Sequence, residues 1–222
     1  MGLITAEDVK ANIYDGSPYT ADYEFAAEKR LTTLRKAFSN IDDKIKADIE
    51  KFDIENPWLS DYAVYMAIKE LENGRPWWEW SSERAHYSSY MKHAADYENA
   101  ADFWKFVQYI FFKQWFDIKD YANDKGIAVI GDMPIYVAMD SVDVWSNLPL
   151  FLIDEKTLKV EKVAGVPPDY FSENGQLWGN PIYDWKAMKK DGYGVQWRFL
   201  HGKGRKFRGY ISKYDKRPIY PE

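Results

Sequence analysis

The sequence contains no cysteine, which excludes disulfide bonds, thiolate catalysis and a cysteine-bound zinc site. It also has no excess of basic residues: 30 Lys and Arg stand against 35 Asp and Glu, which argues against a nucleic-acid-binding groove. No apolar run approaches the ~18–20 residues needed to cross a bilayer. The first ten residues lack the basic and apolar regions of a signal peptide. These absences predict a cytoplasmic protein with neither a nucleic-acid nor a membrane partner.

Motifs for metal and phosphate binding are also missing. The three histidines, His86, His93 and His201, do not occur in an HxxxH or HExxH spacing. The short run at 202–204 contains two glycines and a lysine, but it follows no strand and is too short for a phosphate-binding loop. The sequence therefore predicts no metal and no other cofactor.

Aromatic residues, in contrast, are abundant. They make up 18% of the chain, with ten Trp and seventeen Tyr. Most of them are expected in the core, because large rings bury a large apolar area. The remainder suit a ligand with flat apolar faces and many hydroxyl groups, and a sugar chain has both.

Helical spacing and capping residues predict most of the first 123 residues. Helices are expected at 5–13, 22–40, 42–52, 56–73 and 100–123. The segment 76–80 is interpreted as a ring-rich loop, and 81–98 as weakly helical. Apolar residues occupy nearly all faces of the helix at 100–123, which predicts a buried core helix.

The chain is organised around the segment 126–145. Residues 127–130 form a short apolar, β-branched run that is typical of a buried parallel strand, and a helix and a glycine precede it. This order predicts an α/β fold, in which active sites gather at the carboxyl ends of strands. Asp132, Tyr136 and Asp140 follow the run and are therefore candidates for chemistry.

The two acids are interpreted differently. Asp132 follows Gly131 and is expected to be a structural acid that bonds backbone amides. For Asp140 two interpretations stand side by side: an acid that faces a ligand, or the cap of a helical turn through 142–144.

Residues 164–185 read as one long structured loop, rich in Pro, Gly and Asn. It places Asp169 beside Tyr170 and Phe171, with Trp178 further along. Rings that stack on a sugar face, with a carboxylate that accepts hydroxyl protons, form a sugar-binding arrangement. A compact loop pinned by its own aromatic side chains is the equal alternative. Pairing of 151–153 with 160–163, and a helix at 186–200, are also expected.

The sequence resembles the 4-α-glucanotransferase family, also called amylomaltase or disproportionating enzyme, of the α-amylase superfamily. The similarity lies above all in GDMPIYVAMDSVDVW (131–145) and VAGVPPDYFSENGQLWGNPIYDW (163–185). Further similar stretches are LRKAF (34–38), ENPWLSDYAVYMAIKE (55–70), GRPWWEW (74–80) and FFKQWFDIKDYANDKGI (111–127). It covers roughly residues 2–193.

The resemblance implies an incomplete (β/α)₈ TIM-type barrel with a helix-rich insertion and a long substrate-covering loop. It implies a retaining transfer of α-1,4-glucan segments between maltooligosaccharides. Residues 127–138 would be the third barrel strand and its exit, and 164–180 the loop over the cleft. The substrate-binding residues would be Asp140, Asp169, Tyr170, Phe171, Trp178 and Tyr136.

The catalytic carboxylates of the family have no match in these 222 residues. Neither its nucleophile motif nor its acid/base glutamate is present, so a truncated chain without activity of its own is expected. The expected organisation is a helical insertion at 1–98, a partial barrel segment at 99–200 and an unmatched basic tail at 201–222. The alternatives are a non-catalytic α-glucan-binding module, and a structural fragment that associates with a companion chain through exposed barrel edges.

Overall fold

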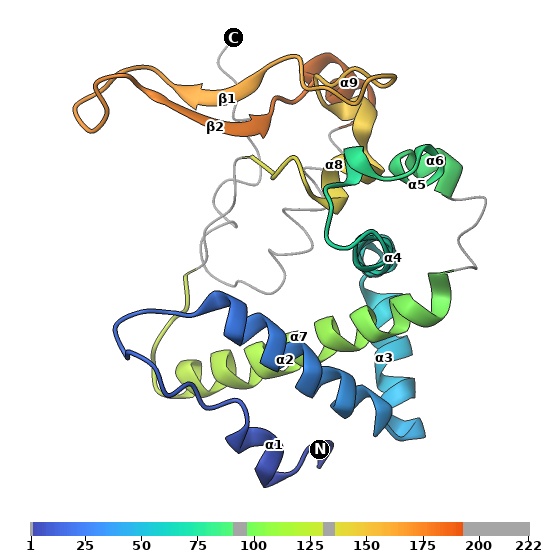
Figure 1. Ribbon diagram of the computed structural model, residues 1–222, viewed down its shortest axis with the longest axis vertical. Coiled ribbons are helices and arrows are strands. Elements are labelled where there is room, and N and C mark those ends of the chain that lie inside the picture. Colours follow the sequence, from blue (N-terminus) through green and yellow to red (C-terminus); the bar gives the residue numbers. More distant parts are fainter. Residues whose placement is uncertain (1, 91–96, 131–135, 193–222) are drawn as a thin grey trace. The chain divides into compact units, whose positions relative to one another are not determined.

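The computed structural model describes residues 2–90, 97–130 and 136–192 (Figure 1). The chain divides into two compact units. Unit 1 comprises Met1–Ala67 and Ala95–Trp115, and unit 2 comprises Ile68–Ala94 and Phe116–Glu222. The domain boundaries expected from the sequence, after residues 98 and 200, stay a prediction.

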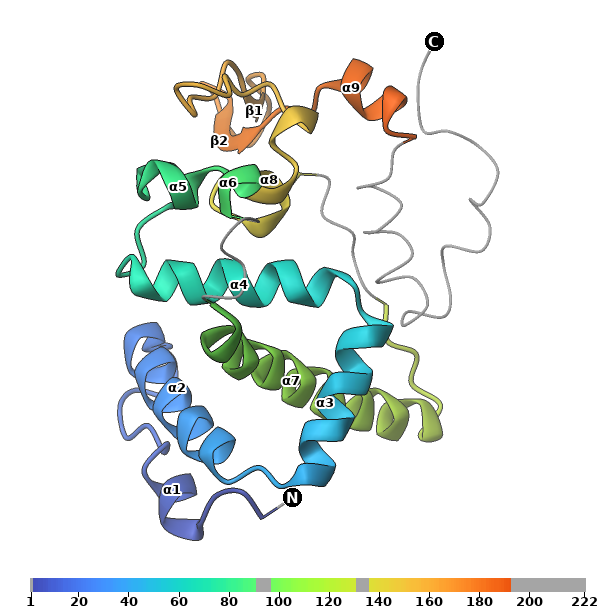
Figure 2. The same cartoon turned by 90° about the vertical axis from the view of Figure 1, so that its right-hand side faces the viewer.

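Unit 1 is helical. Its elements are α1 (Ala6–Lys10), α2 (Tyr23–Ser39), α3 (Asp43–Glu55), most of α4 (Trp58–Leu71) and the first two thirds of α7 (Glu98–Asp124). The structure confirms these helices where the sequence predicts them. Figure 2 shows α2 and α3 packed along α7.

The helix starts of unit 1 are set by local side-chain caps. Asp22 accepts the backbone N–H of Phe25, and Asp42 accepts that of Ile45, each at 2.8 Å. Thr5 and Asp8 form a reciprocal capping box ahead of α1. Each cap satisfies a backbone donor that the first helical turn leaves without an intrahelical partner.

Aromatic rings fill the core of unit 1. The Phe38 ring lies 5.7 Å from that of Phe103 and 5.4 Å from that of Phe106. The Phe52 ring lies 5.5 Å from that of Phe112.

Four residues of α7 are buried, all in its first turns: Ala101, Phe103, Trp104 and Phe106. The remainder of α7 corrects a prediction, because Phe111, Ile118 and Tyr121 are exposed. Apolar spacing shows what a helix is able to bury, but not which elements cover it.

Unit 2 contains short elements. They are η1 (Trp77–Glu79), α5 (Ser82–Ala85), α6 (Tyr87–Tyr90), α8 (Val142–Ser146), η3 (Leu148–Leu150), β1 (Val163–Val166), β2 (Gln176–Pro181) and α9 (Trp185–Lys190). The end of α4 also belongs to it. There Asn73 and Gly74 adopt φ values of +55° and +76°, a left-handed helix ending of the kind that Asn and Gly favour.

The strand expected at 127–130 is absent from the structure, which assigns no regular element there, and Ile127 and Ile130 are exposed. A parallel strand exists only with neighbours that complete its hydrogen bonds, and nothing in the described residues pairs with this run. Asp132 lies outside the described residues. The parallel sheet of an incomplete barrel therefore stays a prediction.

The expected loop at 164–185 is largely an antiparallel β-hairpin (Figure 1). Gly165 pairs with Leu177, and Val166 with Gln176. A Cβ on Gly165 would collide with the Gln176 carbonyl oxygen, so the close approach of the two strands requires glycine there. The long loop of the prediction is thus reduced to the hairpin tip, residues 167–175.

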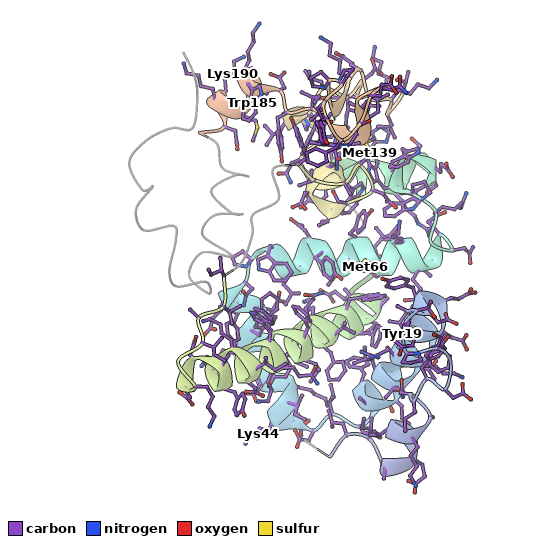
Figure 3. All side chains as sticks on the ribbon, turned by 90° about the vertical axis from the view of Figure 1, so that its left-hand side faces the viewer. Tyr19, Lys44, Met66, Met139, Trp185 and Lys190 are labelled. Atoms are coloured by element: carbon purple, nitrogen blue, oxygen red, sulfur yellow. The ribbon has the colours of Figure 1, made fainter. Side chains whose placement is uncertain are left out.

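Two smaller expectations have mixed outcomes. Ile153 pairs with Val160 as predicted, whereas Phe151 pairs with Tyr183 instead. The helix α9 begins close to the expected residue 186, with Trp185 and Lys190 at its two ends (Figure 3). Residues beyond 192 lie outside the description. Within the described ranges, no helix has an apolar stretch long enough to cross a bilayer.

Candidate functional site

Asp140 lies in unit 2, on the segment that leads into α8. Its carboxylate oxygen Oδ2 forms an ion pair with Nζ of Lys69, in the last turn of α4. The side chain that caps α8 is that of Ser141, whose Oγ accepts the backbone N–H of Val144 at 3.4 Å. The capping interpretation of Asp140 is therefore wrong. Asp140 is a partly buried acid held by a lysine.

Two side-chain donors, one indole and one amide, hold the backbone just before Asp140. The Nε1–H of Trp77 donates to the carbonyl oxygen of Met139 at 2.7 Å. The Nδ2–H of Asn180, on β2, donates to the carbonyl oxygen of Val137 at 2.8 Å. Figure 3 labels Met139 among the packed side chains of unit 2. The second bond ties the segment that carries Asp140 to the strand that carries Trp178.

A row of rings runs beside this backbone connection. The Tyr136 ring lies 6.2 Å from that of Trp178, edge to face, and 6.1 Å from that of Tyr183, stacked at 12°. Tyr183 in turn contacts Phe151 at 5.2 Å and Trp185 at 5.4 Å. Of the predicted site residues, Tyr136 and Trp178 are thus brought into contact.

The base of the row is buried and uncharged. Burial raises the pKa of Tyr183 to about 12, and the nearby Asp143 carboxylate and Tyr136 add to this shift because they disfavour a phenolate. Towards the solvent, Trp178 is 48% exposed. A ring held in place at its base, with its outer part accessible, is suited to stacking against a flat apolar surface.

The hairpin tip carries the remaining predicted residues. Asp169 Oδ1 accepts the backbone N–H groups of Phe171 at 2.9 Å and Ser172 at 2.8 Å. Ser172 Oγ donates to the carbonyl of Gly175 at 2.7 Å. These polar bonds shape the tip, while the rings of Tyr170 and Phe171 are 98% and 88% exposed. The alternative of a loop pinned by its own aromatic side chains does not hold for these two rings.

Two arginines surround the buried carboxylate of Glu72 in unit 2. The buried carboxylate of Glu72 accepts from Arg75 and, at 2.7 Å, from Nη1 of Arg84. The backbone carbonyl of Arg84 accepts the indole N–H of Trp145 at 2.9 Å. Paired in this way, the buried acid is satisfied, as a charge taken out of water must be.

The described residues contain no group of three or more His, Asp or Glu side chains that fits a metal ion. The arrangement instead offers an acid, two rings in contact and two exposed rings. Acids and accessible rings of this kind suit a polyhydroxylated ligand.

Sequence reasoning missed four residues that hold the site: Lys69, Trp77, Asn180 and Tyr183. All four lie in stretches that carry the family resemblance. Their chemistry gave no separate signal, because a lysine at the end of a helix and an asparagine before a proline are common in structural roles.

Comparison with known proteins identifies the relatives of the chain. A 4-alpha-glucanotransferase family model matches residues 2–208, which extends the similarity past residue 193 and into the expected basic tail. The 4-alpha-glucanotransferase of Clostridium butyricum is 40% identical over 194 residues, which cover 86% of this chain and 40% of that protein. The Streptococcus pneumoniae enzyme (strain TIGR4) is 44% identical over 199 residues, covering 86% and 39%.

Comparison with solved structures points to the same family. The amylomaltase from Streptococcus agalactiae in complex with acarbose superimposes with a TM-score of 0.84 at 36% identity, over 93% of this chain and 42% of that one. The amylomaltase from Corynebacterium glutamicum, at 22% identity and a TM-score of 0.57 over 80% of this chain and 23% of that one, shares the fold. The chain spans about 40% of the length of the curated relatives quoted above. Since the family model covers most of its 222 residues, the chain belongs to the 4-alpha-glucanotransferase family.

Proposed function

We propose that the chain carries the α-1,4-glucan-binding part of a 4-α-glucanotransferase that transfers glucan segments between maltooligosaccharides. The observation that carries the proposal is the Asn180–Val137 hydrogen bond, at 2.8 Å. It joins the segment of Asp140 to the strand of Trp178, so that an acid and stacking rings belong to one connected piece of unit 2.

Each group has a role that follows from its exposure. The edge-to-face pair of Tyr136 and Trp178 offers a ring surface for the apolar face of a glucose unit. The Asp140 carboxylate accepts hydrogen bonds from sugar hydroxyl groups, and charge-assisted bonds of this kind are strong. Tyr170 and Phe171, presented by the turn that Asp169 shapes, cover the bound sugar. The structure of a relative in complex with acarbose supports a ligand-binding role for this part of the family fold.

The chemical step needs groups beyond these. Retaining transfer uses two carboxyl groups ~5–5.5 Å apart, one as nucleophile and one as acid and base. The sequence of residues 1–222 contains no match to the nucleophile motif that the resemblance calls for. We therefore propose that a polypeptide of these residues binds maltooligosaccharides without transferring them, and that the companion part of a family barrel supplies the catalytic acids.

Binding is tested by titrating maltohexaose into the purified chain, by calorimetry and tryptophan fluorescence. Trp178→Ala is expected to weaken binding by about tenfold or more, because a stacking ring is removed. Tyr19→Ala is the control, since the Tyr19 ring is 93% exposed and lies in unit 1, which carries none of the proposed site residues. Equal losses in the two variants, or no binding by the unmodified chain, would contradict the proposal.

Transfer is tested with maltotriose as the only substrate. The expected result is no longer maltooligosaccharide after prolonged incubation. Formation of longer products by the unmodified chain, with Asp140→Ala inactive under the same conditions, would show that the chain completes the reaction by itself.

A companion-dependent role is supported by a separate observation. Ile118, Tyr121, Ile127 and Ile130 of unit 2 are all exposed, an unusual number of apolar side chains for the surface of one short segment. Light scattering coupled to size exclusion tests it: self-association, or capture of an added polypeptide that spans the rest of a family barrel, is expected. A monodisperse monomer that forms no complex with the added polypeptide would count against this role.

A further inference from the structure

The segment 69–80 reaches the residues around Asp140 through two separate contacts. Lys69 forms an ion pair with the Asp140 carboxylate. Trp77 donates its indole N–H to the Met139 carbonyl oxygen at 2.7 Å. The first contact concerns the side chain and the second the backbone, so one stretch of chain fixes both the position of Asp140 and the direction of its carboxylate.

Lys69 is itself held from a second side. Its Nζ lies 3.5 Å from the carbonyl oxygen of Arg75, which also accepts the indole N–H of Trp80 at 2.8 Å. The side chains of Lys69 and Asp140 are 22% and 34% exposed, so the pair is partly shielded from solvent. An ammonium group between a fixed carbonyl and a carboxylate has little freedom to move.

We propose that Lys69 is a positioning residue: by engaging Oδ2 of Asp140 it fixes the direction in which the carboxylate meets the sugar hydroxyl groups. The inference rests on the proposed glucan-binding function. The carboxylate torsion of an aspartate has broad minima, so a carboxylate without a fixed partner samples several directions. A partner that removes this freedom before the ligand arrives lowers the entropic cost of binding.

A purely structural ion pair would act differently. Partly exposed pairs contribute little to stability, about 0–1 kcal/mol. Unit 1 contains such a pair for comparison: Lys105 Nζ lies 2.8 Å from Asp53 Oδ2, and the two side chains are 22% and 21% exposed. Lys105 thus matches Lys69 in residue type, in partner and in exposure, but it has no part in the proposed site.

The experiment measures maltohexaose binding and thermal unfolding of the full chain. Lys69→Met is expected to weaken binding by about tenfold while the melting temperature stays close to that of Lys105→Met. Lys105→Met is expected to bind as the unmodified chain does. Lys69→Arg, which keeps a charged donor, is expected to restore most of the affinity lost in Lys69→Met.

A double-mutant cycle with Asp140→Asn tests whether Lys69 acts through Asp140. If it does, Lys69→Met causes no further loss in the Asp140→Asn background. Should Lys69→Met not fold, Lys69→Gln takes its place in the same cycle with the same expectation.

The outcomes separate the two proposals. Binding by the unmodified chain that Lys69→Met leaves intact overturns the role of Lys69 but not the glucan-binding function. Additive losses in the cycle also overturn it, since Lys69 would then act independently of Asp140. No binding by the unmodified chain overturns the glucan-binding function and this inference with it.

Discussion

Aromatic rings occupy both units, but they are used in opposite ways in the helical core of unit 1 and at the hairpin tip of unit 2. In the core, Phe38 and Phe106 lie against each other at 5.4 Å, and Phe106 is fully buried. At the tip, Tyr170 and Phe171 contact each other at 5.7 Å, yet both are almost fully exposed.

The difference lies in what surrounds each pair. Core rings gain free energy by leaving water, about 25 cal/mol per Å² of apolar surface. Rings at the tip gain almost none of this, because they remain exposed to water. The turn is held by polar bonds of Asp169 and Ser172. Exposed aromatic side chains that do not stabilise the fold are accessible to a ligand, in line with the proposed function.

The sharpest test of this contrast replaces one ring of each kind by alanine. Phe106→Ala is expected to lower the free energy of unfolding by about 3–5 kcal/mol, because it leaves a cavity in the core. Phe171→Ala is expected to change it by about 0.5 kcal/mol at most and to weaken maltohexaose binding. Urea unfolding followed by circular dichroism measures the first effect. A Phe171→Ala variant as unstable as Phe106→Ala would end the contrast.

The features that the sequence could predict are those that depend on local contacts. The helix starts at Asp22 and Asp42, and the ending at Asn73 and Gly74, depend on side chains within a few residues of the bonds they make. Such local chemistry can be read directly from the order of residues.

Contacts between distant residues could not be read in this way. The pairing of Lys69 with Asp140 joins residues 71 positions apart, and no spacing pattern reports it. The run at 127–130 has the composition of a buried strand, but composition cannot supply the neighbouring strand that it needs. In the hairpin, the abundance of Pro and Gly favours a loop over the short strands that the tip, residues 167–175, connects.

A second prediction compares the buried Tyr183 of the ring row with the exposed Tyr170 of the hairpin tip. The pKa of Tyr183 is raised to about 12 in the folded chain, against ~10 in the unfolded chain. The contribution of the neutral Tyr183 to the free energy of unfolding is therefore fully present below pH 10. This contribution is lost as the pH rises from 10 to 12, because in this range Tyr183 ionises in the unfolded chain but not in the folded one. A shift of this size corresponds to about 2–3 kcal/mol at pH 12.

Urea unfolding between pH 9 and pH 12 measures this loss. Tyr183→Phe is expected to show a smaller decline with pH than the unmodified chain, since it removes the ionising group. Tyr170→Phe is the control at the exposed end of the contrast and is expected to decline as the unmodified chain does. Identical slopes for all three proteins would mean that Tyr183 is not held neutral by its surroundings.

The smallest expected effect separates two aspartates that make the same kind of bond. Asp42 accepts the Ile45 amide at the start of α3, and Asp169 accepts the Phe171 amide in the hairpin tip, at 2.8 and 2.9 Å. Asp42→Ala is expected to lower the free energy of unfolding by about 1 kcal/mol, because the helix loses its cap. Asp169→Ala is expected to change it by less, about 0.5 kcal/mol, because the tip supports no buried core.

The effect of Asp169→Ala should instead appear as weaker maltohexaose binding, since Tyr170 and Phe171 lose the turn that presents them. A loss of stability in Asp169→Ala as large as in Asp42→Ala, with binding intact, would assign the hairpin tip to the fold and not to the ligand.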